Sequence, residues 1–160
     1  MVTQTSVTAV RILIHLSREA SGEAVSLKQV AEALGESPTY LVKIARHLVR
    51  AGILRAHRGK MGGVVLTRAT EKITLLAVVE ACQGMVHGNF CQDAPDLSKT
   101  CAMHQAGAEL HNAIVGVLTS WTLADFLKQP CPANELQGKV HCLFEGGRPG
   151  LLPSPRKGRR

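Results

Sequence analysis

The feature that most constrains this chain is a pair of short helical segments joined by a tight turn and followed by a basic, glycine-rich hairpin. The first segment begins after Ser26, a good helix-capping residue, and ends at Gly35. The second begins at Pro38, which suits the first turn of a helix, and ends at Gly52. Two helices in this order are typical of a helix-turn-helix.

The hairpin distinguishes this pattern from a generic pair of helices. Residues 53–57 predict a strand and residues 64–66 its return, and the glycines between them permit a tight turn with positive φ. Arg58 and Lys60 project from the tip of that turn. They can contact a phosphate backbone or enter a minor groove. The sequence therefore predicts a winged helix-turn-helix.

Helical periodicity accounts for most of the remaining chain. It predicts helices over about residues 6–18, with one apolar face, and over residues 73–82. A longer helix over residues 101–120 carries more apolar residues than one small domain needs, which favours a dimer interface. Thr122 and Asp125 form a capping box for a short closing helix. The expected fold is mainly α, with a small β-hairpin wing and a long dimerisation helix.

Charge is distributed unevenly along the chain. Residues 1–69 carry a net charge of +6, residues 70–145 of −4, and residues 146–160 of +5. We expect a DNA-binding domain over 1–84, an irregular loop over 85–100, to which the family resemblance described below assigns the sensor, a dimerisation helix with the closing helix over 101–128, and an extension over 129–160. The Pro/Gly-rich, basic end of that extension is expected to be disordered.

Other functional classes fit the sequence less well. The apolar runs are too short to cross a bilayer and the N-terminus lacks a secretory pattern, so we expect a cytoplasmic protein without a membrane partner. An enzyme is not expected, because the chain shows neither a phosphate-binding glycine loop nor a base-orienting partner for a Cys–His pair. A winged helix that binds protein is disfavoured by the basic first 69 residues.

Several blocks of sequence, in their order and spacing, resemble the IscR/NsrR/RirA family of bacterial regulators. The blocks are residues 37–41, 48–54, 58–66, 73–75, 80–84 and 122–125, within a resemblance that spans roughly residues 5–128. Members of that family are winged-helix homodimers that bind palindromic operators in double-stranded DNA. Many carry an iron–sulfur cluster that senses iron–sulfur supply, nitric oxide or redox state.

The resemblance implies a set of DNA-binding residues at the front of the recognition helix: Ser37, Thr39, Tyr40 and Lys43. Hydroxyls there can donate to phosphates or base edges, and Lys43 can reach a guanine or a phosphate. In the hairpin, Arg58 corresponds to the family's wing arginine, and Lys60 lies near it at the expected tip. Three further arginines are expected to contact the DNA backbone or solvent: Arg46, Arg50 and Arg55.

The resemblance also implies metal ligands for a [2Fe–2S] cluster: Cys91, Cys101 and His104. Related cluster proteins have three cysteines in this region, but here the middle one is missing and nine residues separate Cys91 from Cys101. His104 lies on the same helical face as Cys101, where IscR-type proteins place a histidine ligand. A thiolate near a helix N-terminus is stabilised, which suits Cys101 as a ligand.

Alternatives remain open at this sensor. A fourth ligand could come from His87, Asp93, Asp96, the partner subunit or an exogenous group. The chain could instead be a thiol- or metal-responsive regulator without a cluster, or carry no cofactor. Of the other candidates, Cys82 is expected in the core, Cys131 and Cys142 in an accessory metal site or disulfide, and His111 in a structural role.

Overall fold

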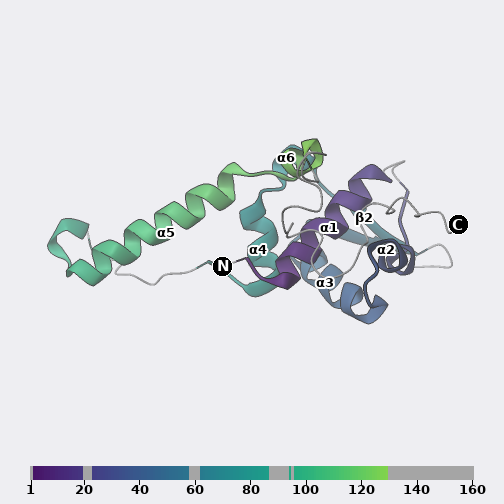
Figure 1. The fold of residues 1–160 in the computed structure, drawn as a ribbon, viewed down its shortest axis with the longest axis horizontal. Helices are drawn as coiled ribbons and strands as arrows, with labels where there is room; N and C mark the ends of the chain where they lie inside the picture. Colours follow the sequence, from purple (N-terminus) through teal and green to yellow (C-terminus); the bar gives the residue numbers. More distant parts are fainter. Residues whose placement is uncertain (1, 20–22, 58–61, 87–93, 95, 130–160) are drawn as a thin grey trace, which may run out of the picture.

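The computed structural model describes residues 2–19, 23–57, 62–86, 94 and 96–129. Figure 1 shows a winged-helix body from which one long helix extends. The described elements are α1 (Gln4–Arg18), α2 (Leu27–Leu34), α3 (Pro38–Arg50), β1 (Leu54–His57), β2 (Gly63–Leu66), the 3-10 turn η1 (Thr70–Lys72), α4 (Leu75–Gln83), the 3-10 turn η2 (Leu97–Lys99), α5 (Ala102–Ser120) and α6 (Leu123–Lys128). This order confirms the mainly helical fold with a β-hairpin wing.

Helix α1 is the centre of the body. The sequence predicts one apolar face on this helix, but every residue from Ser6 to Ile14 is buried. The helix is enclosed because α2, α3, β2, α4 and α6 all pack against it. It therefore joins the helix-turn-helix, the wing and the closing helix through one shared core.

Capping residues set the ends of the two helices of the helix-turn-helix. The Ser26 hydroxyl accepts a 3.3 Å hydrogen bond from the backbone N–H of Lys28 at the start of α2. Gly35 ends α2 in the left-handed conformation (φ 65°), which glycine adopts without steric cost. Pro38 occupies the first turn of α3, whose buried side consists of Leu41, Ile44, Ala45 and Leu48.

The wing is anchored to the body by a short extra strand contact. Strands β1 and β2 pair antiparallel, from Leu54 opposite Leu66 to His57 opposite Gly63. Val25 and Val64 exchange two backbone hydrogen bonds of 2.9 and 3.0 Å. A Cβ atom at Gly63 would overlap the backbone carbonyl of Val25, so this close approach requires glycine.

The helix predicted over residues 73–82 begins two residues later in the structure. Helix α4 begins at Leu75 because the Thr74 hydroxyl caps it, accepting a 3.2 Å hydrogen bond from Ala77 N–H. Ile73 is extended, and its carbonyl accepts a 2.8 Å hydrogen bond from Leu123 N–H. This pairing brings α6 back onto the body, where Leu123 is buried in the core.

Candidate nucleic-acid interface and sensor site

The outward face of α3 is basic. Opposite the buried side lie five exposed residues, Thr39, Val42, Lys43, Arg46 and Arg50. Neither α3 nor β1 contains an acidic residue, and β1 adds the exposed Arg55. This face therefore presents positive charge without a local carboxylate to neutralise it.

The N-terminus of α3 brings two of the predicted DNA-binding hydroxyls to the surface. Ser37 is the exposed N-cap residue, and its side chain makes no capping hydrogen bond. Thr39 is exposed in the first turn. Tyr40 turns the other way, since its ring packs against the core and its hydroxyl lies 3.5 Å from that of Thr5. Ser37 and Thr39 thus face solvent, whereas Tyr40 braces α3 against α1.

A groove of about 380 Å³ separates α3 from the hairpin. Its floor is apolar, with side chains of Val42, Ala45, Val49, Ala56 and Val64. Arg46 and Arg50 line the same groove from α3. An apolar floor with cationic margins can seat a sugar–phosphate backbone, because deoxyribose is largely apolar and phosphate is anionic.

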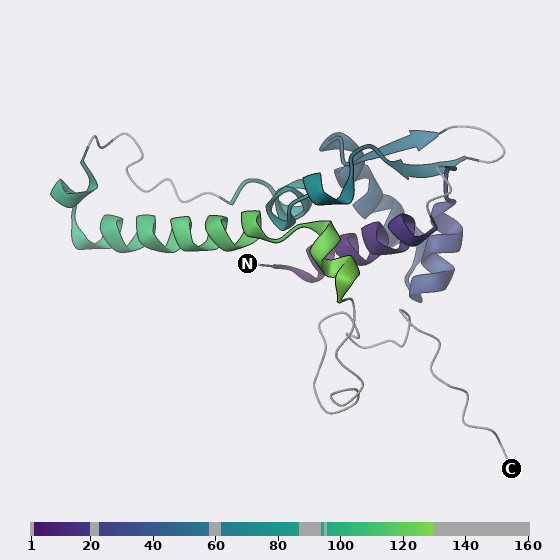
Figure 2. The same cartoon turned by 90° about the horizontal axis from the view of Figure 1, so that it is seen from above.

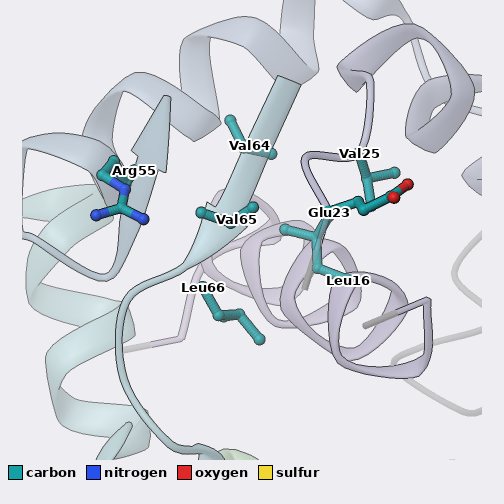
Figure 3. A pocket seen from close by; sticks show the side chains of 7 residues that line it. All are labelled: Leu16, Glu23, Val25, Arg55, Val64, Val65 and Leu66. Carbon is teal, nitrogen blue, oxygen red and sulfur yellow. The ribbon is translucent and has the colours of Figure 1, made fainter. Parts of the chain in front are cut away.

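A second hollow, of about 160 Å³, lies on another side of the hairpin (Figure 3). Apolar side chains from β2, from Val25 and from Leu16 line it, with Arg55 and Glu23 on opposite sides in this view. Its walls include Leu16 and Val64 of the hydrophobic core. The hollow therefore continues the packing of the wing onto α1. The predicted wing cations Arg58 and Lys60 lie outside the described residues.

The start of α5 brings together two of the three predicted metal ligands. Cys101 is the exposed N-cap residue, and its Sγ lies 2.8 Å from Nδ1 of His104. The Gln105 amide holds the preceding turn by donating to the carbonyls of Ser98 and Thr100. Cys91 lies outside the described residues.

The other residues weighed as ligands are placed as follows. Asp96 is held locally, because its carboxylate accepts from the Ser98 hydroxyl at 2.6 Å and lies 3.3 Å from Lys99 Nζ. The Ser98 hydroxyl holds the pKa of Asp96 below its usual value. His87, Asp93, Cys131 and Cys142 lie outside the described residues, and among those described no three His, Cys, Asp or Glu side chains gather around a common point.

Cys82 has the core position that the sequence predicts. It is partly buried on α4 and packs against the hydrophobic core. Burial raises the pKa of its thiol to about 11. Cys82 is therefore a protonated thiol at neutral pH, unsuited to nucleophilic chemistry or metal binding.

Helix α5 leaves an apolar stripe exposed. Met103, Leu110 and Val117 recur every seven residues and are 74%, 61% and 58% exposed, and Trp121 follows the helix end. Figures 1 and 2 show α5 meeting the body at its C-terminal end and pointing away from the wing. None of the described helices is long and apolar enough to cross a membrane.

Sequence reasoning missed the partner of Arg11. Arg11 is 2% exposed, and its guanidinium forms an ion pair of 2.9 Å with Glu36 and donates to the Leu34 carbonyl at 3.0 Å. The sequence feature that indicates a buried partner is that Arg11 is the one charged residue within the apolar run of residues 10–14. Periodicity shows that such a side chain is buried but not which distant residue pairs with it.

Comparison with known proteins supports the resemblance inferred from the sequence. The family model Rrf2, described as "Iron-dependent Transcriptional regulator", matches residues 2–129. The chain is 33% identical over 135 residues to protein aau3 of Rhizobium meliloti (strain 1021), covering 81% of this chain and 86% of that protein.

Two solved structures show the same fold. CymR of B. subtilis, the global cysteine regulator, has a TM-score of 0.65 at 24% identity, with 80% of this chain and 96% of that chain covered. IscR of T. potens has a TM-score of 0.62 at 24% identity, with 86% and 96% covered.

Proposed function

Because the chain belongs to the Rrf2 family of transcriptional regulators, we propose that it recognises a specific DNA operator with α3 in the major groove and the hairpin against the adjacent backbone or minor groove. The observation that carries this proposal is the outward face of α3. It combines free hydroxyls at Ser37 and Thr39 with the cations Lys43, Arg46 and Arg50, and no carboxylate lies on that helix.

The groove beside α3 supports the same orientation. When a recognition helix occupies the major groove and a wing the neighbouring minor groove, the backbone ridge between the two grooves passes over the space between helix and wing. Arg46 and Arg50 border that space here. Arg58 and Lys60, which the sequence places between the two strands, would add positive charge for the duplex backbone.

Selection from a random duplex library, followed by titration at several salt concentrations, tests this proposal. We expect a defined sequence motif and an affinity that falls steeply with salt. Arg46→Ala should reduce the salt slope by roughly one unit per bound subunit, the effect of losing one phosphate contact in each. Lys72→Ala, which removes an exposed cation from η1, is the matched control. A salt-independent interaction, or no selected sequence, would contradict DNA binding.

We propose that the chain acts as a homodimer through α5, on a palindromic operator. The stripe of Met103, Leu110 and Val117 has the seven-residue spacing of a helix–helix seam and is exposed in a single chain. Two-fold pairing through this stripe would present two α3 helices to two half-sites. In this arrangement residues 1–84 read DNA, residues 85–100 form the sensor loop, and residues 101–128 join the subunits.

Light scattering coupled to gel filtration tests the dimer. Leu110→Glu places a charge in the stripe and should convert a dimer of full-length chains into monomers at micromolar concentration. Glu109→Ala alters the neighbouring exposed position and should leave the mass unchanged. A wild-type chain that elutes as a monomer at all concentrations would contradict the dimer.

We propose that the sensor is an iron–sulfur cluster, of the [2Fe–2S] type, held by Cys91, Cys101 and His104 with a fourth ligand from elsewhere. The support is that Cys101 Sγ and His104 Nδ1 lie together at the start of α5, 2.8 Å apart in a hydrogen bond that a metal bound by both side chains would replace. When bound, the cluster would supply a redox-sensitive group. The residues of the chain would hold it at the tip of α5 and order the loop before it.

The second candidate is a thiol switch in the same fold without a cluster. It is favoured by the exposure of Cys101 beside an imidazole and by the presence of only two converging donors in the described part of the chain. CymR, which shares the fold, is described as a cysteine regulator. In this version an oxidant such as a peroxide converts the Cys101 thiolate to a sulfenic acid, which can then condense with a second thiol to a disulfide with loss of water.

Anaerobic purification with visible spectroscopy and iron and sulfide analysis separates the two sensors. A cluster gives brown protein with acid-labile sulfide, and Cys101→Ala or His104→Ala should abolish both. Cys82→Ala is the control and should keep them, because Cys82 lies in the core. Colourless protein after reconstitution would overturn the cluster and leave the thiol switch and the DNA-binding proposal standing.

A further inference from the structure

We propose that Val42 reads the C5-methyl group of a thymine in the operator. This inference rests on the proposed DNA-binding function and names a specificity contact within it. Val42 lies three residues after Thr39 and four before Arg46, so the three side chains share one stripe on the outward face of α3. That stripe begins in the first turn, and the N-terminal residues of a recognition helix contact base edges.

The exposure of Val42 is unusual for its position. It is 37% exposed, and the other exposed large apolar side chains of the described residues lie at Val2, beyond α4 or on α5 and its end. Within α2, α3 and the described strands, no other large apolar side chain is as exposed as that of Val42. It lies at the edge of the cationic face of α3, beside Arg46 and on the side of the groove that Ala45 and Val49 also line.

The chemistry of this position matches one feature of the major groove. Each base pair presents hydrogen-bonding groups there, and thymine alone adds a methyl group. Valine has no donor or acceptor and cannot distinguish the polar edges of the other bases. Its branched methyls can cover the thymine methyl, while Arg46 on the next turn anchors a phosphate or a guanine. Val42 also lines the groove beside the hairpin, so its side chain lies where the outward face of α3 meets that groove.

A double-mutant cycle between protein and DNA tests this contact. The bound sequence is first selected from a random duplex library with the full-length chain. Each thymine of that sequence is then replaced by deoxyuridine, which lacks only the methyl group. Binding is measured by fluorescence anisotropy. We expect one thymine per half-site at which deoxyuridine weakens wild-type binding about fourfold, the effect of one apolar carbon removed from a contact.

The protein arm uses Val42→Ala, with Val2→Ala as the matched control. Both replace an exposed valine, but Val2 precedes α1. Val42→Ala should bind the thymine and deoxyuridine duplexes equally, whereas Val2→Ala should keep the fourfold difference. Because the uridine substitution alters only DNA, folding of the variant cannot produce the wild-type difference.

Two results would overturn the contact. One is a selected sequence in which no thymine responds to deoxyuridine. The other is a response that persists unchanged in Val42→Ala, as expected if the valine is a solitary surface residue or faces a protein partner. Failure to select any sequence would instead overturn the proposed DNA binding itself, so the two failures are distinguishable.

Discussion

The guanidinium of Arg11, in the middle of α1, lies 2.9 Å from the carboxylate of Glu36, in the turn between α2 and α3. The same guanidinium donates to the Leu34 carbonyl near the end of α2. One buried side chain thus fixes the turn that immediately precedes the solvent-facing Ser37 and Thr39. The central helix and the recognition helix are joined by charge as well as by apolar packing.

Arg11→Met should destabilise the fold by roughly 2–4 kcal/mol, because it leaves the Leu34 carbonyl and the Glu36 carboxylate without their buried donor. Glu36 is partly exposed and can recover some hydration, so the loss should be smaller for Glu36→Gln, which keeps an acceptor beside Arg11. Urea unfolding of both variants measures the difference. Equal stabilities for wild type and Arg11→Met would show that the pair contributes nothing.

Gly63→Ala should weaken the wing. A Cβ at this position would meet the carbonyl and backbone of Val25, so the strand contact between Val25 and Val64 must move apart. We expect a loss of about 1–3 kcal/mol, typical of overpacking. Faster amide exchange at Val25 and Val64, measured by hydrogen–deuterium exchange, should accompany it. Unchanged exchange at these two amides would contradict the proposed overlap.

The two described cysteines should differ sharply in reactivity. The Cys82 thiol has a pKa raised to about 11 by burial, so the reactive thiolate is scarce until the pH approaches that value. Cys101 is exposed beside His104. At pH 8, iodoacetamide should label Cys101 in the folded, cluster-free protein and leave Cys82 largely unmodified, as read by peptide mass spectrometry. Comparable labelling of both would refute the core position of Cys82.

Acid should loosen α6 in a defined range. The Asp125 carboxylate accepts from the hydroxyl and the N–H of Thr122 at 2.7 and 3.1 Å, and the Thr122 hydroxyl is the main cause that lowers its pKa to about 2. A lowered pKa stabilises the folded state above the ordinary value near 4. This stabilisation is lost as the pH falls from about 4 to 2.

Asp125→Asn provides the check on that range. The variant lacks the titrating group, so its melting temperature should be lower than that of wild type by a few degrees at pH 6, on the order of one lost cap. The difference should shrink as the pH falls toward 2. A difference that stays constant over this range would show that Asp125 titration does not act through the cap.

The sequence predicts an element well where a capping or helix-ending residue marks its end. Gly35, Pro38 and the Thr122–Asp125 box each mark a helix end to within a residue or two. The start of α4 was predicted too early because the apolar run is continuous through Ile73. The extended conformation of Ile73 depends on Leu123, fifty residues away, through a hydrogen bond that local periodicity cannot report.

The candidate sites likewise divide into features that the sequence displays locally and features that depend on tertiary packing. The basic face of α3 and the Cys101–His104 pair follow from spacing along single helices, which a sequence displays directly. The inward turn of Tyr40 and the Arg11–Glu36 pair depend on how α1 crosses α3, and this crossing is set by the whole core. The solvent-facing Val42 emerges only when the buried side of α3 is known.

Helix α5 separates two parts of the chain that tolerate change differently. At about 1.5 Å per residue its 19 residues place Cys101 roughly 28 Å from the end that joins the body. Around α1, almost any altered side chain would disturb several packed neighbours. At the far end of α5, side chains can be exchanged without cost to the core. Different side chains can therefore be accommodated at the tip of α5 while the winged-helix body stays as it is.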